Sequence, residues 1–314
     1  MLKNFKPLYW IYNFFKKSEL SHNVPLYKKY GIEKAYYSSV SSKDFQDLEA
    51  PKNKYDKIDT AKHIAKEPNF DQLPSNWQEA LKGWSQNGFA VLEGFLNDKE
   101  AEAINTEIET LINSKEVKFR YNGKKIMFAF HRSKLIRDLA IGNKICGILN
   151  MLMGKEVSLF QSINFLKASE QKTHSDSIHM TTFPLGNLIA VWIALEDIGE
   201  DQGPLHYYPK SHTLPYLMNA DFDNVGSKLF LGKKTYLDYE EKINTLLTEK
   251  SLKKQSFHAK KGDLFIWHAN LLHGGNPMNN KKLTRKSMVL HYYAKDAICY
   301  HELTQRPSFM KVKY

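Results

Sequence analysis

A series of short apolar segments in the second half of the chain constrains the fold more than any other feature of the sequence. The segments are rich in β-branched and aromatic residues and are separated by Gly, Pro, Asn and Asp, as is typical of strands joined by turns. They cover residues 157–166, 188–195, 205–208, 264–267 and 287–293. Because they follow a helical third of the chain, the sequence predicts a mainly β fold, a two-sheet jelly roll with flanking helices.

The organisation of the chain changes near Pro74. Residues 1–74 show few periodic features, so we expect an N-terminal extension with short helices. Residues 75–314 are expected to form the main domain. Helix start signals and helical spacing of apolar residues place its first helices at 75–86, 97–111 and 143–153. Residues 221–255 interrupt the strands and contain a predicted helix over about 239–252, which suggests a lid beside a site.

The 314-residue chain has an ordinary globular composition, with 42% hydrophobic and 25% charged residues. Its two cysteines, Cys146 and Cys299, cannot form a disulfide framework, which makes a reducing cytoplasm the simplest compartment. The formal net charge of +11 comes from lysines dispersed along the chain, as is typical of a solvated surface. No nucleic-acid-binding motif accompanies this charge, so we expect no nucleic-acid partner.

Residues 1–17 combine aromatic side chains with flanking lysines. Their apolar stretch is too short to span a bilayer, and no small-residue cleavage site follows it, so we expect no secretory signal. Trp10, Tyr9 and Tyr12 with basic flanks would suit a peripheral contact with a membrane interface. The commoner alternative is an arm that packs on the domain or on a second subunit. The sequence leaves the oligomeric state open.

The first candidate metal-binding element is His174-Ser175-Asp176. In an extended segment the side chains at i and i+2 point the same way, so His174 and Asp176 can converge on one cation while Ser175 faces away. Alone the motif is weak evidence, because a chain with 12 histidines contains about one such pair by chance. A solvated loop is the alternative interpretation if no other element matches.

The second element follows a Gly-Asp turn and an apolar strand, and ends in His273-Gly274-Gly275. The glycines permit close approach of the backbone, which makes His273 the third candidate ligand. Two imidazoles and one carboxylate on one face of Fe(II) leave three positions open for a bidentate co-substrate and dioxygen. His268 is a rival ligand, although it should face the opposite side of the strand. Three further histidines are candidates for structural roles near a pocket: His179, His206 and His212.

An Arg285-Lys286-Ser287 segment lies a dozen residues beyond His273. A guanidinium matches a carboxylate with paired donors, and Ser287 points the same way along a strand and can add a hydroxyl. The pair is therefore suited to hold the far carboxylate of the co-substrate.

Taken in order, these elements resemble the phytanoyl-CoA dioxygenase family. The resemblance rests on His174-Ser175-Asp176, residues 191–197, Gln202-Gly203-Pro204-Leu205, residues 209–212, Gly262-Asp263, His273-Gly274-Gly275 and Arg285. It covers roughly residues 75–295 and leaves the first 70 residues outside. The family commonly has Pro-Gly-Ser-His where this chain has Lys210 in place of the glycine, so no loop conformation is carried over.

The resemblance implies a double-stranded β-helix, a cupin-like jelly roll, that binds Fe(II) and uses 2-oxoglutarate and O2 as co-substrates to hydroxylate an unactivated C–H bond. By position it assigns the iron to His174, Asp176 and His273, and 2-oxoglutarate to Arg285, Ser287, Gln161 and Trp192. Core packing is the alternative role for Trp192. Related halogenases have a small residue at the position of Asp176, so the carboxylate here favours hydroxylation.

Two other functions fit the same residues. One is a jelly-roll metalloprotein that binds a sugar or lipid without oxidative turnover, and the other is a basic module that binds membranes or nucleic acid. The sequence does not identify the substrate, because fold and cofactor chemistry do not determine what enters the pocket. Candidates are an acyl thioester, an amino acid or compatible solute, and a lipid-linked or glycan precursor. The aromatic N-terminus favours a lipid-like molecule.

Overall fold

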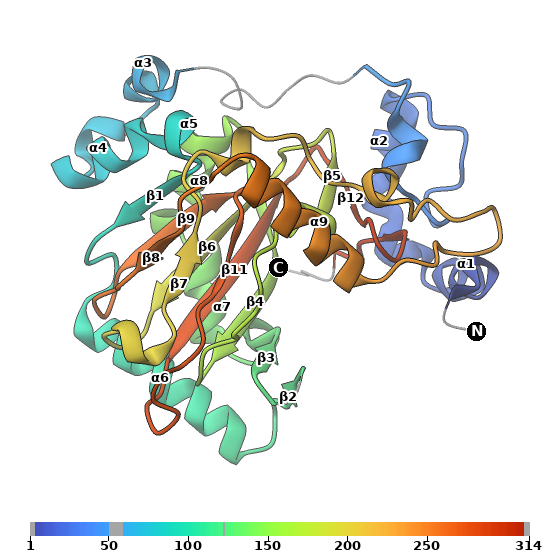
Figure 1. Cartoon of the computed structure of the whole chain (residues 1–314). Coiled ribbons are helices and arrows are strands. Elements are labelled where there is room, and N and C mark those ends of the chain that lie inside the picture. The colour runs from blue at the N-terminus through green and yellow to red at the C-terminus, as the bar shows by residue number, and fades with distance from the viewer. Residues whose placement is uncertain (1–3, 50–58, 122, 311–314) are drawn as a thin grey trace.

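Antiparallel strands form a large sheet at the centre of the computed structural model, which describes residues 4–49, 59–121 and 123–310 (Figure 1). The sheet has seven strands in the order β1-β9-β6-β11-β4-β3-β2. They are β1 (Phe89–Leu92), β9 (Leu264–His268), β6 (Leu188–Ala194), β11 (Ser287–Ala294), β4 (Val157–Phe165), β3 (Lys125–Met127) and β2 (Phe119–Arg120). The central strands β6, β9 and β11 are buried along their whole length, which explains their continuous apolar sequences.

A smaller sheet of order β10-β7-β8 packs against the large one. Its strands are β10 (His273–Gly275), β7 (Leu205–Tyr207) and β8 (Gln255–Phe257). An isolated antiparallel bridge between His174 and His273 extends this sheet by one further segment. Trp192, Val289 and Ile163 are cross-strand neighbours in the large sheet, and they form one buried cluster with Leu205 and other residues of the small sheet. This arrangement of two sheets confirms the predicted jelly roll.

Helices cover the opposite face of the large sheet. They include α4 (Ser75–Lys82), α6 (Asp98–Asn113), α7 (Lys134–Ile141) and α8 (Asn143–Met153), with the short α3 (Thr60–His63) and α5 (Trp84–Asn87) at one end. The predicted start of α6 is confirmed, because Asn97 and Glu100 bond each other's backbone N–H groups in a capping box. Its apolar stripe then packs in the main core with Leu264 and Ile266 of β9.

The N-terminal residues pack beside a third sheet of order β13-β12-β5. The elements here are α1 (Lys6–Phe15), α2 (Val24–Lys29), β5 (Thr181–Phe183), β12 (Ile298–His301) and β13 (Arg306–Pro307). Phe45 stacks on Phe183 with ring centroids 4.4 Å apart, and buried Glu302 accepts hydrogen bonds from the backbone and hydroxyl of Ser42. Helix α1 packs nearby, since Asn13 donates to Tyr37 O and the Arg306 guanidinium lies over the Tyr9 ring. The described part of residues 1–17 thus forms an arm on the domain, which was one of the two interpretations.

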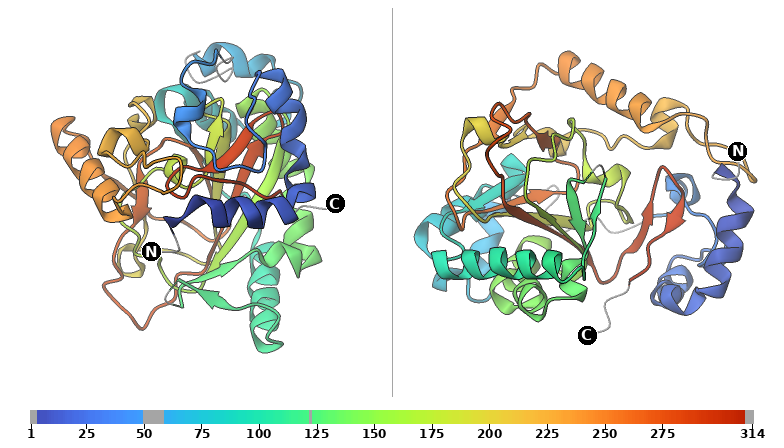
Figure 2. Two further views of the ribbon diagram at one scale, coloured as in Figure 1. Left: turned by 90° about the vertical axis from the view of Figure 1, so that its right-hand side faces the viewer. Right: turned by 90° about the horizontal axis from the view of Figure 1, so that it is seen from below.

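The predicted insertion contains helix α9 (Tyr236–Glu249). It begins three residues before the predicted start because the Thr235 side chain accepts a hydrogen bond from Leu237 N, and Asp238 completes a capping box. Tyr239 and Ile243 are buried on its inner side. Figure 2 shows α9 lying across one side of the jelly roll, with the loop before it reaching α1. Among the described helices, none has the length and apolar character needed to cross a lipid bilayer.

Candidate functional site

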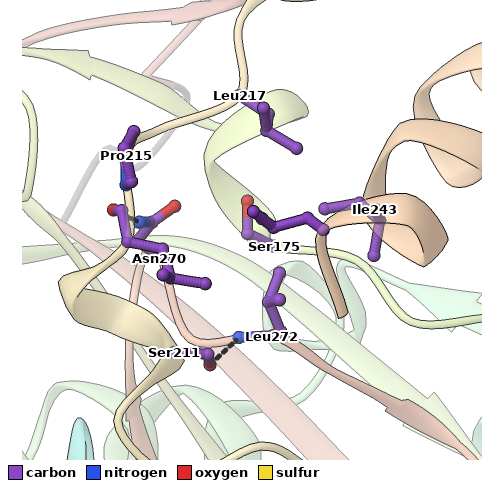
Figure 3. A pocket seen from close by; sticks show the side chains of 9 residues that line it. Ser175, Ser211, Pro215, Leu217, Ile243, Asn270 and Leu272 are labelled. Atoms are coloured by element: carbon purple, nitrogen blue, oxygen red, sulfur yellow. Dashed lines mark hydrogen bonds between the residues drawn. The ribbon is translucent and has the colours of Figure 1, made fainter. Parts of the chain in front are cut away.

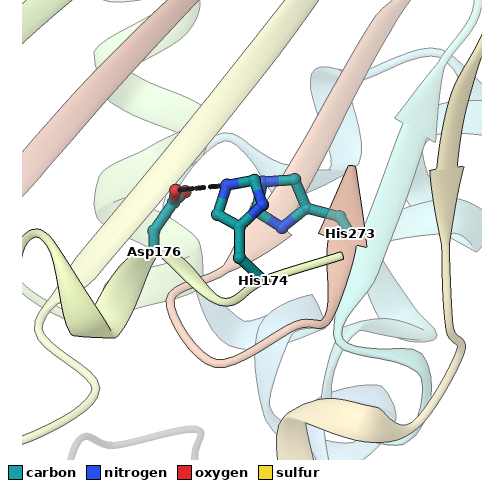
Figure 4. A group of neighbouring side chains, drawn as sticks. All are labelled: His174, Asp176 and His273. Atoms are coloured by element: carbon teal, nitrogen blue, oxygen red, sulfur yellow. Dashed lines mark ion pairs between the residues drawn. The ribbon is translucent and has the colours of Figure 1, made fainter. Parts of the chain in front are cut away.

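Two imidazoles and one carboxylate meet in the buried space at the edge of the two sheets (Figure 4). The Nε2 atoms of His174 and His273 lie 3.7 and 3.8 Å from Oδ1 of Asp176. One ligand atom from each residue can be chosen so that all three lie within 4.8 Å of one another. The structure therefore brings together the three residues that the sequence proposed as metal ligands.

The backbone explains this convergence. His174 N donates to His273 O, and His273 N donates to His174 O, both at 2.9 Å, so the two histidines lie side by side. The extended segment is short, since Asp176 already begins a 3-10 turn ending at Ile178. Ser175 between them is extended, which keeps the two flanking side chains on one side. Ser175 itself points away and donates its backbone N–H to the Tyr239 hydroxyl of α9 at 3.0 Å.

Hydrogen bonds to the backbone fix both imidazoles as metal-binding tautomers. The Nδ1 atom of His174 lies 2.8 Å from Lys172 O, and Nδ1 of His273 lies 2.9 Å from Leu271 O. Because a carbonyl oxygen only accepts, each Nδ1 carries the proton and each Nε2 presents a lone pair. This is the usual support of metal-bound histidines.

The second oxygen of Asp176 is held by two further residues. Trp267 Nε1 donates to Oδ2 at 2.7 Å, and His291 Nε2 lies 3.4 Å from it. Burial opposes ionisation of the carboxyl, but the nearby imidazoles of His273 and His291 outweigh it and hold the pKa of Asp176 below its usual range. Burial, with the neighbouring His273, lowers the pKa of His174 well below its usual value. The cluster thus offers an anionic carboxylate beside a neutral His174 imidazole.

Sequence reasoning missed the roles of Trp267 and His291. Both lie on strands whose alternate residues face the space between the sheets. Each pairs across the strands with Ala190 of β6, which belongs to the buried cluster between the two sheets. The signal was present for His291, because it follows Arg285 and Ser287 with the period of two expected along one face of a strand. The role of Trp267 depends on which strand lies beside which, and the sequence does not give that order.

Arg285 is buried to 2% exposure, just before β11. One guanidinium nitrogen donates to Ser287 Oγ at 2.9 Å, while Nε has no hydrogen-bond partner among the residues that the structure describes. The guanidinium lies over the Trp192 ring, 4.8 Å from its centroid, and burial lowers the pKa of Arg285 to about 10. Across the described ranges, Arg285 forms no ion pair within 4.0 Å. The nearby carboxylate of Glu196 opposes this lowering of the pKa without forming an ion pair, and a buried guanidinium whose donors reach no carboxylate is costly, so this site fits a ligand that brings one.

The other two residues proposed near the co-substrate face the same space. Trp192 is buried, with its Nε1 lacking a partner, and forms one wall beside Arg285. Gln161 is half-buried and pairs across the strands with His291, which places it nearer to the metal-ligand cluster. Ser287 pairs with Phe165 and Ala194 on the same face.

Lys125 is a second cation at this site, which the sequence did not reveal. Its Nζ lies 6.0 Å from the centroid of Phe165, and the Arg285 guanidinium lies 5.9 Å from the same ring. Lys125 donates to Gln171 Oε1 at 2.8 Å, and Gln171 Nε2 in turn lies 3.1 Å from His174 Nε2. Burial lowers the pKa of Lys125. Lys125 and Gln171 therefore connect the Arg285 region to the metal-ligand cluster.

The remaining candidate histidines lie outside the metal-ligand cluster. His268, the rival ligand, accepts a hydrogen bond from Asn270 N and contacts Trp84 on the helical side. Its ring also lies against His212, and His206 bonds Thr173 at 2.9 Å. These three have structural surroundings, as the sequence interpretation favoured.

His179 lies closer to the cluster than those three. Its ring centroid is 6.2 Å from that of His174 and 4.8 Å from that of Tyr236 at the start of α9. Burial lowers the pKa of His179 to about 4, which keeps the imidazole neutral near pH 7. On its other side lies His301 of β12, with the ring centroids 5.3 Å apart. This wall of neutral imidazoles and a tyrosine lies beside the candidate ligands.

A small pocket lies on the opposite side of the ligand backbone (Figure 3). It is lined by Ser175, which separates the first two ligands, by Leu272, which precedes the third, and by Ile243 of α9. Ser211 Oγ accepts a hydrogen bond from Leu272 N at 2.9 Å. The insertion thus packs directly against both ligand-bearing segments.

Comparisons with known proteins agree with this geometry. The chain is 24% identical over 187 residues to phytanoyl-CoA dioxygenase domain-containing protein 1 of Bos taurus, covering 42% of this chain and 64% of that protein. It is 24% identical over 230 residues to ectoine dioxygenase of Nocardia farcinica, covering 66% of this chain and 76% of that enzyme. The chain therefore spans slightly less than two thirds of the bovine relative.

A solved structure shares the fold. It is the non-haem α-ketoglutarate-dependent carbocyclase SnoK from nogalamycin biosynthesis, with a TM-score of 0.59, 17% identity, and coverage of 73% of this chain and 87% of that one. The family model for phytanoyl-CoA dioxygenase (PhyH) matches residues 84–287, well over half of the chain. This chain belongs to the phytanoyl-CoA dioxygenase family.

Proposed function

We propose that this protein is an Fe(II)- and 2-oxoglutarate-dependent dioxygenase that hydroxylates an unactivated C–H bond of a small-molecule or lipid-like substrate. One observation carries the proposal: a His-Asp-His donor set and a buried guanidinium without a carboxylate partner occupy one face of the same jelly roll. The first fits a divalent metal, and the second fits a diacid that reaches the metal from the side of Arg285. Family membership supports the same chemistry.

In this proposal Fe(II) is held by Nε2 of His174, Nε2 of His273 and Oδ1 of Asp176. Bound iron supplies the activation of O2 that is coupled to oxidative decarboxylation of 2-oxoglutarate. The protein keeps the donors in place, since Trp267 holds the free oxygen of Asp176 and backbone carbonyls orient both imidazoles. Three ligands on one side leave room for the co-substrates on the other.

Arg285 and Ser287 would bind the distal carboxylate of 2-oxoglutarate. Ser287 already accepts a hydrogen bond from the guanidinium and holds it in one orientation, while the Trp192 ring covers the guanidinium and excludes water. Gln161 faces the space between this end and the metal donors, where it can donate to the co-substrate. Lys125 lies near the same Phe165 ring as Arg285 and adds positive charge.

The test is the formation of succinate by the full chain supplied with Fe(II), 2-oxoglutarate and O2, screened against candidate substrates. We expect 2-oxoglutarate consumption that requires iron and is lost in His174→Ala. His258→Ala is the matched control, because His258 is exposed and pairs with Glu200 far from the metal donors. Metal binding without any binding or consumption of 2-oxoglutarate would instead support a jelly-roll metalloprotein that performs no oxidation.

A further inference from the structure

Helix α1 presents apolar side chains to solvent. Leu8, Ile11, Tyr12 and Phe15 recur at the i, i+3, i+4 and i+7 positions of one helical face, and they are 43, 48, 54 and 81% exposed. On an ordinary surface helix this stripe would face the core. Here the buried residue of the helix is Asn13, whose side chain donates to Tyr37 O at 3.0 Å.

The inner side of α1 is fixed by specific contacts. Trp10 and Phe14 both lie against the Tyr37 ring, with centroid distances of 5.5 and 5.7 Å. The Arg306 guanidinium of β13 lies 3.7 Å from the centre of the Tyr9 ring. The outward direction of the apolar stripe is therefore set by packing of the opposite side.

A neighbouring turn of the insertion enlarges the same surface. Lys6 N donates to Leu229 O at 2.8 Å, and Leu231 N donates to Asn4 O at 2.9 Å. The rings of Phe5 and Phe230 lie 5.2 Å apart. Leu229 and Phe230 are 53 and 44% exposed, so the turn 227–231 adds apolar area at the N-terminal end of α1. We call α1 and this turn together the apolar face.

Lysines border the apolar face. Lys6 lies at the start of α1, and Lys16 and Lys17 lie at its end, where their Nζ atoms are 5.3 and 4.8 Å from the ring centroids of Tyr12 and Phe14. No acidic residue occurs within α1, and Glu19 beyond it pairs with Lys16. Aliphatic and aromatic side chains flanked by lysines are the composition of helices that lie in a membrane interface.

We propose that the apolar face docks the protein on the surface of an anionic lipid bilayer, with α1 lying in the plane of the interface. The lysines that border the apolar face favour an anionic bilayer as its partner. Acidic headgroups complement lysines beside a buried apolar stripe, and the whole chain carries a net charge of +11. A second copy of the chain would place the same lysines against each other, at an electrostatic cost. The proposal concerns a surface outside the metal site and is independent of the proposed chemistry.

The test is sedimentation of the full-length protein with vesicles of phosphatidylcholine alone or mixed with phosphatidylglycerol. We expect binding to the anionic vesicles that weakens on raising the salt concentration, and a loss of at least about tenfold in Ile11→Glu/Phe15→Glu. The matched control is Phe119→Glu/Leu135→Glu, because these residues are 41 and 42% exposed, lie outside the apolar face, and receive the same change in charge. Near-UV circular dichroism and thermal melting check that each variant is folded.

The charged border is tested separately. Lys16→Gln/Lys17→Gln should weaken binding to anionic vesicles several-fold, whereas Lys253→Gln/Lys254→Gln, an exposed pair elsewhere, should have a smaller effect. Equal losses in both lysine pairs, or in both glutamate pairs, would overturn the proposal, as would a wild-type protein that does not sediment with anionic vesicles. Light scattering tests whether a second copy of the chain covers the apolar face. If the wild type is a dimer that does not bind vesicles, and Ile11→Glu/Phe15→Glu makes it a monomer, the apolar face serves self-association.

Discussion

The two ends of the candidate site differ in how their polar groups are satisfied. At the metal-donor end, Lys172 O, Leu271 O and Trp267 each bond one of the three donor side chains, although Nδ1 of the neighbouring His291 is buried without a partner among the described residues. At the other end, the Nε of Arg285 and the Nε1 of Trp192 are buried without a partner. The contrast indicates that the protein itself orients the metal donors, whereas no described carboxylate bonds the Arg285 guanidinium directly. A site of this kind is preorganised at one end and completed by its ligand at the other.

The largest effect should come from breaking the metal-donor end. Asp176→Ala removes the one negative charge among the three donors and leaves Trp267 Nε1 without its acceptor. We expect turnover of 2-oxoglutarate to fall by about 10³-fold or more, because metal catalysis supplies several kcal/mol of stabilisation. The measurement is succinate formation at saturating iron. Retention of even a tenth of wild-type turnover would contradict the proposed ligand set.

Removing the charge of Arg285 should weaken the binding of 2-oxoglutarate without weakening the fold. Arg285→Leu is expected to raise KM for 2-oxoglutarate by about 10²-fold, since two charged hydrogen bonds are lost. Without co-substrate the same variant should be at least as stable as the wild type, because it removes an unpaired buried charge. Lys286→Leu is the control, since Lys286 pairs with Glu109 at the surface. A strongly destabilised Arg285→Leu would show that the guanidinium is needed by the fold itself.

A smaller loss should follow from weakening the support of Asp176. Trp267→Phe keeps a ring in the core but removes the 2.7 Å hydrogen bond to Oδ2, so we expect iron affinity to fall by about 10- to 100-fold. Trp77→Phe deletes an equivalent indole hydrogen bond, to Glu93 O, away from the site. Titration of both variants with Fe(II) under anaerobic conditions measures the difference. Equal affinities would show that Trp267 does not support iron binding.

The wall beside the metal donors should make stability depend on pH. Burial lowers the pKa of His301 to about 3, so the unfolded chain binds more protons than the folded one as the pH falls below 6.5. The free energy of unfolding is therefore highest above pH 6.5 and falls as the solution becomes more acidic. From pH 7 to pH 5, the wild type should lose about 2 kcal/mol relative to His301→Gln. Urea unfolding at both pH values measures this difference. An equal loss of stability in the wild type and in His301→Gln would contradict the prediction.

The smallest effect is expected outside both ends of the site. Lys210 adopts a left-handed backbone conformation with φ of 69°, which is costly for any residue with a β-carbon. Lys210→Gly should raise the free energy of unfolding by up to about 1 kcal/mol, since the relief of strain exceeds the entropy that glycine gains on unfolding. Thermal melting tests the sign, and a clear destabilisation would show that the lysine side chain contributes more than its backbone costs.

The sequence predicted the jelly roll because its strands are short, apolar and separated by turn residues, and the positions of β4, β6, β9 and β11 follow that pattern. The convergence of the three candidate donors was predictable because His174 and Asp176 are close in sequence and His273 has its own motif. Trp267 and Lys125 were not predictable. Their roles depend on pairings between distant strands, β6 with β9 and β3 with β4, and no local pattern encodes that order.

The start of α9 shows a different limit. Apolar spacing found the helix but placed both of its ends three residues too late. Its first residue, Tyr236, follows a side-chain cap at Thr235, four residues before the first buried position, Tyr239. Capping polar residues carry no periodicity, so a search for an apolar stripe finds the middle of a helix more readily than its end. The same limit applies at Asp176, where a 3-10 turn begins at a residue whose side chain still faces the two histidines.

The reciprocal backbone bonds between His174 and His273 couple assembly of the metal site to completion of the fold. A chain that has been synthesised only as far as Leu272 contains two of the three donors but not the segment that aligns them. In the proposed ligand set, high-affinity iron binding would therefore require β10 to have been synthesised and to have paired with β7. With these three ligands, an incomplete chain would bind redox-active iron only weakly, which would limit oxidation of the protein by iron in a partly formed site.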